Sequence, residues 1–313
     1  MKDLRNASRV GHLQFLSDED KRDIYLAVLE ILGKVGMLVH HDEARAMLLE
    51  AGCSLTADDR VLIPRRLVEQ ARLSVPPVVD VYDRGGERAM ELGGYNSYFG
   101  TGSDLMSTYD LETGEHRPSV LEDVRRAARL VDALPHLDFV MSSAHPTEQD
   151  PHQAYLLSFQ AMLENTTKPL VMTAENAGDL KVMIDIAGEL RGGAEELRQK
   201  PYFVVYNEPS SPLVHPVDSL DKLLLCADSG VPSIYSPAPL AGATAPITVA
   251  GHTAQGVAEC LFGLVIHQLR RPGAPFLFGI GSAVLDIATA QSSYNDLGYL
   301  TGYMCAVEMA KWL

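Results

Sequence analysis

The chain has 313 residues, of which 46% are hydrophobic, and its 26 basic and 41 acidic residues give a formal net charge of −15. A chain of this length can bury one large core or fold as two smaller domains. A strongly acidic protein repels phosphate backbones, which argues against nucleic-acid binding, whereas a small cationic ligand would be attracted to it. A solvated acidic surface without functional meaning explains the same charge equally well.

The cysteines and the apolar segments indicate the compartment. Four cysteines are scattered without a Cys-x-x-Cys pair, each in apolar context where cysteine serves as a small core residue: Cys53, Cys226, Cys260 and Cys305. We therefore predict a reducing, cytoplasmic compartment. Residues 1–15 lack the apolar segment of a secretory signal. Charged residues or proline interrupt the longest apolar stretches, so we expect no membrane-spanning helix.

Residues 1–77 are predicted to form an N-terminal helical layer with no chemistry of its own. A helix is expected to begin after Ser17, with acidic residues in its first turn, and to end at Gly36. A second, short helix is expected over residues 42–51, and a third is expected to begin after Pro64.

Residues 78–313 are predicted to form a barrel with inserted hairpins. Residues 78–92 have the pattern of a hairpin that turns at a glycine pair. A second hairpin is expected around residues 112–115, as a lid or collar near the mouth of the barrel. Ser119 is predicted to cap the next helix, because Glu122 stands three residues later, at the spacing of a capping box.

Short apolar runs alternate with amphipathic helical stretches at intervals of about 30 to 43 residues, the length of a strand–helix unit. The expected strands are Ser97–Gly100, Phe139–Ser143, Leu170–Thr173, Phe203–Tyr206, Ser233–Tyr235 and Phe276–Gly279. Consecutive units of this kind predict a parallel sheet, and six or more favour a (β/α)8 barrel over an open doubly wound sheet.

Six strands are fewer than the eight that close such a barrel. The last stretch, residues 297–313, is predicted to be a helix, and Leu313 has no stop signal such as glycine or proline. We therefore expect a TIM-type barrel that is truncated after about six strand–helix units. Its unpaired edges would favour a homo-oligomer, and activity that depends on the last strands would be weak.

In barrels of this kind the chemistry lies at the carboxyl ends of the strands, called the mouth. Aromatic faces and one or two carboxylates there would bind a quaternary ammonium group through cation–π attraction. The candidate binding residues are Tyr98, Phe99, Asp104, Glu175, Tyr206, Asn207, Glu208, Tyr235, Gly279 and Gly281. One of the adjacent pair Tyr98 and Phe99 is expected to pack inside the barrel. The two glycines either let a ligand approach the backbone or shape a loop.

No residue is assigned a catalytic role, and no metal site is predicted. The sequence has no Gly-x-Ser-x-Gly elbow, no His-x-x-x-His pair and no cysteine-rich cluster, and a lone Gly-x-Gly is a weak sign of phosphate binding. His145 is expected to be a hydrogen-bonding loop residue. Lys168 precedes its strand, so it is expected at the bottom of the barrel.

Six ordered segments carry a family resemblance. They are LEILGKVGMLVHHDEARAMLLEAG (Leu29–Gly52), RVLIPRRLVEQA (Arg60–Ala71), YFGTGSD (Tyr98–Asp104), TTKPLVMTAEN (Thr166–Asn176), YNEPSSPL (Tyr206–Leu213) and SPAPLAGATAPITVAG (Ser236–Gly251). On these segments the chain resembles the trimethylamine methyltransferase family, the corrinoid-dependent methyltransferases of tertiary and quaternary amines. The resemblance implies a (β/α)8 barrel and methyl transfer to the Co(I) of a corrinoid (cobalamin) that a separate protein carries, with no cofactor bound directly.

One branch of that family carries pyrrolysine at a strand end, and another lacks it and uses quaternary amines such as glycine betaine. The position that distinguishes them lies beyond Leu313; the predicted aromatics favour the quaternary branch, with trimethylamine as the alternative substrate. Methyl transfer is an in-line displacement in which the amine leaves neutral, so positioning matters more than an acid or a nucleophile. Two other hypotheses are a metal-independent lyase or hydrolase with Glu175 or Glu208 as general base, and a non-catalytic amine-binding protein.

Overall fold

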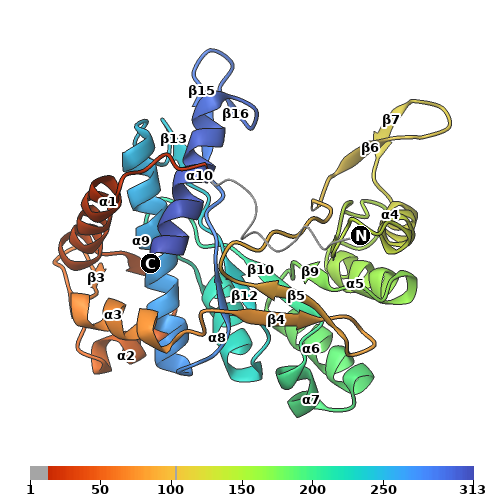
Figure 1. Ribbon diagram of the computed structural model, residues 1–313, viewed down its shortest axis with the longest axis horizontal. Coiled ribbons are helices and arrows are strands. Elements are labelled where there is room, and N and C mark those ends of the chain that lie inside the picture. Colours follow the sequence, from red (N-terminus) through yellow and green to blue (C-terminus); the bar gives the residue numbers. More distant parts are fainter. Residues whose placement is uncertain (1–12, 103) are drawn as a thin grey trace. The chain divides into compact units, whose positions relative to one another are not determined.

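The computed structural model describes residues 13–102 and 104–313, which form two compact units (Figure 1). Within that part of the chain, the first unit contains residues 77–206 and 229–232, and the second contains residues 13–76, 207–228 and 233–313. Both units combine helices with parallel strands. The predictions for the first twelve residues and for Ser103 lie outside the described residues.

Three parallel strands form the sheet of the first unit. They are β8 (Val140–Met141), β9 (Leu170–Met172) and β10 (Phe203–Asn207), with β9 between the other two. Leu170 is aligned with both Val140 and Phe203. Every residue of β9 is buried, as expected for a strand of a parallel sheet that is covered on both faces. Three of the predicted strands are thus confirmed.

The helices of the first unit alternate with its parallel strands along the chain. They are α4 (Leu121–Ala133), α5 (Ala154–Asn165), α6 (Ala177–Arg191) and α7 (Ala194–Gln199), and α5 contacts both α4 and α6. The start of α4 corrects the predicted cap. Its N-cap is Val120, and the N–H of Val120 donates to the Asp123 carboxylate at 2.9 Å. The side chain that caps the start of α4 is therefore that of Asp123, and not the predicted pair of Ser119 and Glu122.

Both predicted hairpins of the first unit are confirmed. Each consists of an antiparallel pair, β4 (Val79–Tyr82) with β5 (Arg88–Leu92), and β6 (Ser107–Tyr109) with β7 (His116–Pro118). In Figure 1 the β6–β7 hairpin projects from its unit beyond α4. Tyr109 and Leu111 near its tip are largely exposed. Its proposed role as a lid stays a prediction.

The first predicted strand, Ser97–Gly100, does not form as a regular strand. The segment instead runs beside β8 with two isolated parallel bridges, Gly100 to Phe139 and Leu105 to Ala144. Between them, the Thr101 hydroxyl accepts from the N–H of Met141 at 2.8 Å and donates to its carbonyl at 2.6 Å. Because a side chain takes the place of backbone pairing here, the ladder is interrupted.

In the second unit two parallel strands pack against a long buried helix. The strands are β12 (Ser233–Tyr235) and β14 (Phe276–Phe278), and the helix between them is α9 (Val249–Arg270). Ser233 is aligned with Phe276 and Tyr235 with Phe278. The last two predicted strands are therefore confirmed. Residues of α9 from His252 to Gln268 are all buried.

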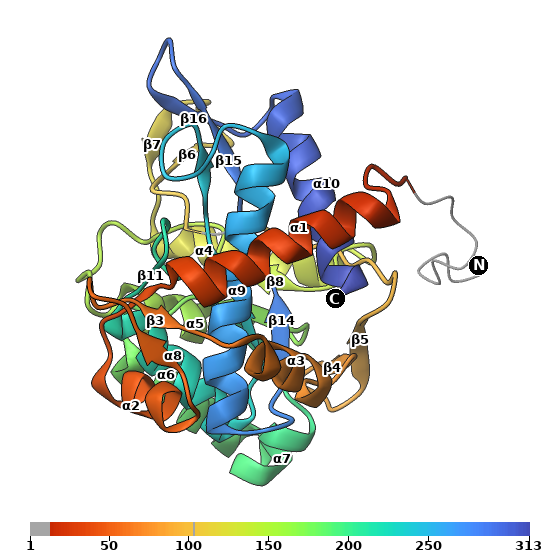
Figure 2. The same cartoon turned by 90° about the vertical axis from the view of Figure 1, so that its left-hand side faces the viewer.

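Helix α9 bears on the expectation that no helix spans a membrane. Among the described residues it is the one helix long and apolar enough to cross a membrane by length and composition. Most of it is buried inside the protein, which is also how the core helix of a globular unit looks. In Figure 2, α1 (Asp18–Glu30) crosses α9, and α10 (Leu297–Trp312) lies beside it; both contact α9.

The predicted N-terminal helices form in the second unit. The Ser17 hydroxyl accepts from the N–H of Asp20 at 3.1 Å, and the Asp20 carboxylate accepts from the N–H of Ser17 at 2.8 Å, which starts α1. A π-helical turn continues it to Gly36, whose φ of 73° ends it as predicted. The remaining helical elements are η2 (Ile31–Val35), α2 (Asp42–Glu50), α3 (Arg65–Ser74) and α8 (Val217–Ser229).

Short strands complete the second unit. The pairs are β1 (Leu38–Val39) with β11 (Val214–His215) in parallel, β2 (Ser54–Leu55) with β3 (Val61–Leu62) antiparallel, and β13 (Leu240–Ala241) parallel to β15 (Ala283–Asp286), which pairs antiparallel with β16 (Gln291–Ser293). Across residues 13–102 and 104–313 the parallel strands do not close into a barrel. The (β/α)8 architecture therefore stays a prediction.

Candidate functional site

In the first unit, Asp104 joins the carboxyl ends of two neighbouring strands. Its carboxylate accepts from the Ser142 hydroxyl at 2.6 Å and from the Thr173 hydroxyl at 3.2 Å, and these residues directly follow β8 and β9. Its own N–H donates to the Ser142 carbonyl at 2.6 Å. Asp104 has a φ of 56°, a left-handed conformation that aspartate tolerates better than most residues. Asp104, which was predicted at the carboxyl end of the first expected strand, thus lies beside the carboxyl ends of β8 and β9.

Two rings and a second carboxylate lie near Asp104. Burial, followed by the negative charges of Asp104 and Glu175, raises the pKa of Tyr155 on α5 to about 12. The His145 ring packs edge-on against Tyr155 with centroids 5.4 Å apart, and the His145 N–H donates to the Leu105 carbonyl at 3.0 Å. This first-unit cluster of Asp104, Glu175, Tyr155 and His145 is negatively charged and partly aromatic. Glu175 is exposed.

In the second unit, Asn207 and Ser236 are joined through their backbones. The N–H of Ser236 donates to the Asn207 carbonyl at 2.9 Å, and the Asn207 side-chain amide donates to the Ser219 carbonyl at 2.7 Å. Among the residues that the structure describes, the amide oxygen of Asn207 is buried without a hydrogen-bond partner. The exposed Glu208 follows directly. An open amide acceptor and a carboxylate are thus adjacent at this end of β10.

The two candidate glycines lie against Ser236 and differ in how tightly they pack. A Cβ on Gly279 would lie 2.8 Å from Cβ of Ser236, so the close packing of these strand ends requires glycine there. A Cβ on Gly281 would lie 3.6 Å from Oγ of Ser236 and 3.7 Å from the Tyr303 hydroxyl, which are ordinary contact distances. Gly279 therefore has a packing role, and Gly281 borders Tyr303.

Tyrosines of α10 form an aromatic wall that the sequence analysis missed. The rings of Tyr299 and Tyr303 have centroids 4.8 Å apart, and Tyr294 lies 5.7 Å from Tyr299. The pKa of Tyr303 is raised mainly by burial and further by Tyr299, Tyr294 and the charge of Glu208. The available signal was the spacing of Tyr299 and Tyr303, which places both on one side of a predicted helix.

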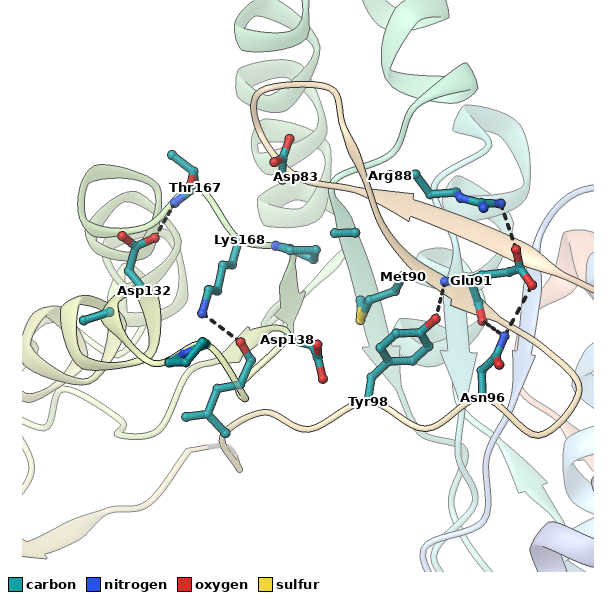
Figure 3. A pocket seen from close by; sticks show the side chains of 15 residues that line it. Asp83, Arg88, Met90, Glu91, Asn96, Tyr98, Asp132, Asp138, Thr167 and Lys168 are labelled. Carbon is teal, nitrogen blue, oxygen red and sulfur yellow. Dashed lines mark hydrogen bonds and ion pairs between the residues drawn. The ribbon is translucent and has the colours of Figure 1, made fainter. Parts of the chain in front are cut away.

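Tyr98 lies away from the mouth, which corrects its predicted place. It lines a pocket of about 760 Å³ with Asp138, Lys168 and Pro169, which precede β8 and β9 (Figure 3). The Tyr98 hydroxyl accepts from the N–H of Glu91 at 2.9 Å. Because this segment runs parallel to β8, Tyr98 stands at the start of the strand and Asp104 at its end. Neighbouring Phe99 is 66% exposed and its N–H donates to Asp138.

The charged groups of this pocket have structural partners. Lys168 donates to the carbonyls that end α4 and follow it, those of Val131 and Leu134 at 2.6 Å and Leu137 at 2.8 Å. Arg88 pairs with Glu91 at 2.8 Å. Figure 3 shows Lys168 among the lining residues, with one of its hydrogen bonds dashed. Lys168 thus satisfies helix-end carbonyls at the amino ends of the strands, in agreement with the prediction for this residue.

Tyr235 is a core residue, which corrects the prediction that it lines the mouth. Its side chain is fully buried, and its hydroxyl lies 2.7 Å from Nδ1 of His215. A Cβ on Gly263 of α9 would collide with its ring. Tyr206, the penultimate residue of β10, is half-buried. Within residues 13–102 and 104–313, no three His, Cys, Asp or Glu side chains are grouped to hold a metal ion.

Comparisons with known proteins identify similar sequences. A family model described as trimethylamine methyltransferase (MTTB) matches residues 2–310. Trimethylamine methyltransferase MttB of Desulfitobacterium hafniense DCB-2 is 29% identical over 287 residues, which is 91% of this chain and 58% of the relative. Glycine betaine methyltransferase of D. hafniense Y51 is 25% identical over 282 residues, 90% of this chain and 58% of the relative.

A third similar protein comes from an organism of another genus. Trimethylamine methyltransferase MttB of Methanosarcina thermophila is 27% identical over an alignment of 312 residues that covers 95% of this chain and 63% of that protein. The chain therefore spans about three fifths of the length of these curated relatives.

Proposed function

The chain belongs to the trimethylamine methyltransferase family, and on that premise we propose that it is part of an enzyme that moves a methyl group from a methylated amine to the Co(I) of a corrinoid. The corrinoid is carried by a separate partner protein and serves as the methyl acceptor. Two kinds of substrate appear in the names of the relatives, trimethylamine and glycine betaine. We propose a quaternary amine for this chain.

The observation that supports this substrate class is the tyrosine wall beside Glu208. A quaternary ammonium cannot donate hydrogen bonds, so a protein binds it with ring faces and a nearby negative charge. Tyr299 and Tyr303 supply two rings, and the charge of Glu208 adds to the effect of burial and of the neighbouring tyrosines in raising the pKa of Tyr303. Gly281 borders the Tyr303 hydroxyl, and Asn207 adds an amide oxygen within the same unit.

The proposed reaction requires the binding residues mainly to position the substrate. The nitrogen–methyl bond breaks with its electron pair staying on nitrogen, the methyl is taken by the acceptor's electron pair, and no proton moves. The positive charge on nitrogen disappears in this step, so a site that held the cation too strongly would raise the barrier. One exposed carboxylate and tyrosine faces suit that requirement, and holding the methyl in line with the acceptor supplies the rate enhancement.

The remaining features belong to the same proposal. The parallel strands are part of a (β/α)8 barrel, and the partner approaches the carboxyl ends of those strands. The alternative of a lyase or hydrolase with Glu175 or Glu208 as general base has less support. Both carboxylates are exposed, and a general base is usually tuned by burial or by close charged neighbours.

Ligand stabilisation tests the substrate class. We expect glycine betaine and other trimethylammonium compounds to raise the melting temperature, because a ligand at a hundredfold excess over Kd stabilises by about 2.7 kcal/mol. The matched control is tert-butylacetate, which has the shape of glycine betaine without its positive charge. Equal stabilisation by both compounds would contradict a cation site. Methyl transfer from the stabilising amine to cob(I)alamin then tests the reaction.

A further inference from the structure

A carboxylate stands in the middle of the most buried helix of the second unit. Glu259 on α9 is fully buried, between Ala258 and Cys260, which are also fully buried. Burial raises the pKa of its carboxyl group, and three hydrogen bonds oppose that shift. Placing a carboxylate there costs free energy that an apolar side chain of similar size would not cost. The contacts of Glu259 therefore need an explanation beyond packing.

Three neutral donors satisfy this carboxylate. Oε2 accepts from the Ser211 hydroxyl at 2.6 Å, and Oε1 accepts from the N–H of Leu213 at 2.8 Å and from the side-chain amide of Gln255 at 2.9 Å. Gln255 also donates to the Thr244 carbonyl at 2.9 Å, so its own orientation is fixed. Two of the three donors belong to the segment that follows β10.

That segment is strained at the point where Glu259 holds it. Leu213 has a φ of 59°, a left-handed conformation that a leucine adopts only when its surroundings impose it. Its N–H is held by Glu259, and its carbonyl accepts from the N–H of Leu38 at 3.0 Å. Ser210 and Val214 exchange backbone hydrogen bonds around it at 2.9 and 3.0 Å. The segment is thereby fixed on both sides of Leu213.

The same segment begins with Glu208, which directly follows Asn207. The Asn207 carbonyl accepts from the N–H of Ser236, and Ser236 and Tyr303 both border Gly281, so this end of the segment lies toward Tyr303. The charge of Glu208 also helps to raise the pKa of Tyr303. We propose that Glu259 is a positioning residue: by holding Ser211 and Leu213 it fixes residues 208–213 so that Glu208 stays beside Tyr303. Its effect on amine binding rests on the proposed function, whereas its effect on the segment does not. A buried polar group that specifies one conformation at some expense in stability is an attested use of such groups.

Hydrogen exchange of the full chain tests the positioning directly. Glu259→Leu removes every acceptor, and Ser211→Ala removes one contact with less risk to folding. We expect amide exchange of residues 208–215 to become about ten- to a hundredfold faster in Glu259→Leu and several-fold faster in Ser211→Ala. Ser210→Ala is the matched control, because Ser210 is exposed and neighbours the anchored serine; its exchange should equal that of the wild type.

Glu259→Gln separates positioning from charge. Its amide oxygen can still accept from Leu213 and Gln255, and its amide nitrogen can donate to the Ser211 hydroxyl, which accepts as well as donates. We therefore expect exchange of residues 208–215 to return to within about threefold of the wild type. Unchanged exchange in Ser211→Ala, or Glu259→Gln as fast as Glu259→Leu, would overturn the proposal.

A double-mutant cycle with tetramethylammonium as ligand tests whether Glu259 affects amine binding through Glu208. We expect Glu259→Leu and Glu208→Gln to weaken binding by similar factors, and the double variant to bind no more weakly than either. If the two losses of affinity instead multiply in the double variant, Glu259 does not act through Glu208. If the wild type does not bind tetramethylammonium, the amine site of the proposed function is wrong, and the exchange experiment alone decides the role of Glu259.

Discussion

The hydroxyl of Tyr235 lies 2.7 Å from Nδ1 of His215, and the two rings are stacked with their planes 5° apart. Both side chains are fully buried, and Nε2 of His215 lies 3.2 Å from the sulfur of Met37. Burial lowers the pKa of His215 to about 3, so its imidazole is neutral near pH 7. With its Nε2–H directed toward Met37, the neutral imidazole accepts a hydrogen bond from the Tyr235 hydroxyl at Nδ1. This pair anchors β11 to β12 inside the second unit.

The first prediction concerns acid stability. The pKa of His215 is lower in the folded protein, about 3, than its ordinary value of 6.5, so the unfolded chain binds more protons between these two values. The free energy of unfolding is therefore fully present above pH 6.5 and falls as the pH drops, by about 1.4 kcal/mol per pH unit for this group. Urea unfolding of wild type and His215→Gln from pH 7 to 5 measures the difference in slope. His152→Gln, at an exposed position, should keep the wild-type slope.

The second prediction compares two neighbouring glycines. Gly279→Ala should lower the free energy of unfolding by about 1–3 kcal/mol, because its new Cβ would meet Cβ of Ser236 at 2.8 Å. Gly281→Ala is the matched control and should stay within about 0.5 kcal/mol of the wild type, since its Cβ finds ordinary contact distances. Urea unfolding of both variants checks this. Equal effects at the two positions would show that packing against Ser236 is not the reason for Gly279.

The third prediction concerns the end of α4. Lys168→Met keeps the aliphatic part of the side chain but leaves three carbonyls without their shared donor. We expect a loss of about 1–3 kcal/mol in the free energy of unfolding and unchanged binding of amines. Lys181→Met is the control: Lys181 forms an exposed pair with Asp185, so the change should alter stability by less than about 0.5 kcal/mol. A loss of amine binding in Lys168→Met without a loss of stability would contradict a purely structural role.

The fourth prediction tests the tyrosine wall. Tyr303→Leu should weaken binding of a trimethylammonium ligand by about 1–2 kcal/mol, roughly five- to thirtyfold in Kd, because a ring face next to a desolvated cation is lost. Calorimetric titration measures this. Tyr109→Leu in the β6–β7 hairpin is the control, since that ring is 70% exposed. An unchanged Kd in Tyr303→Leu would remove this wall from the amine site.

Strand and helix positions followed from local patterns. A buried parallel strand is a short apolar run bounded by turn residues, and five such runs became β8, β9, β10, β12 and β14. Three helix ends were predictable because their signals act within one helical turn. They are the capping hydroxyl of Ser17, the positive φ of Gly36 and the missing N–H of Pro64. The cap of α4 was predicted one residue too early, at Ser119. The contact of Val120 with Asp123 decides between the two neighbouring positions.

The positions of the side chains in the structure could not be predicted from those patterns. In a three-residue strand such as β12, alternation defines two faces but not which of them the core covers, so Tyr235 was placed at the mouth although His215 and α9 enclose it. Tyr98 and Asp104 were both taken as mouth residues, although a segment that runs the length of β8 must put one at each end. Tyr303 was missed because its neighbours Gly281 and Glu208 are distant in the chain.

The sequence by itself therefore determined the family, the order of strands and helices and most of their boundaries, because these depend on contacts within a few residues or on long ordered segments of similarity. Only the tertiary structure decided which polar and aromatic residues meet. The Tyr235–His215 contact, the anchoring of Leu213 by Glu259 and the wall of Tyr299 and Tyr303 beside Glu208 all join residues far apart in the chain. Such contacts arise from how whole elements pack, and no local period of the sequence encodes them.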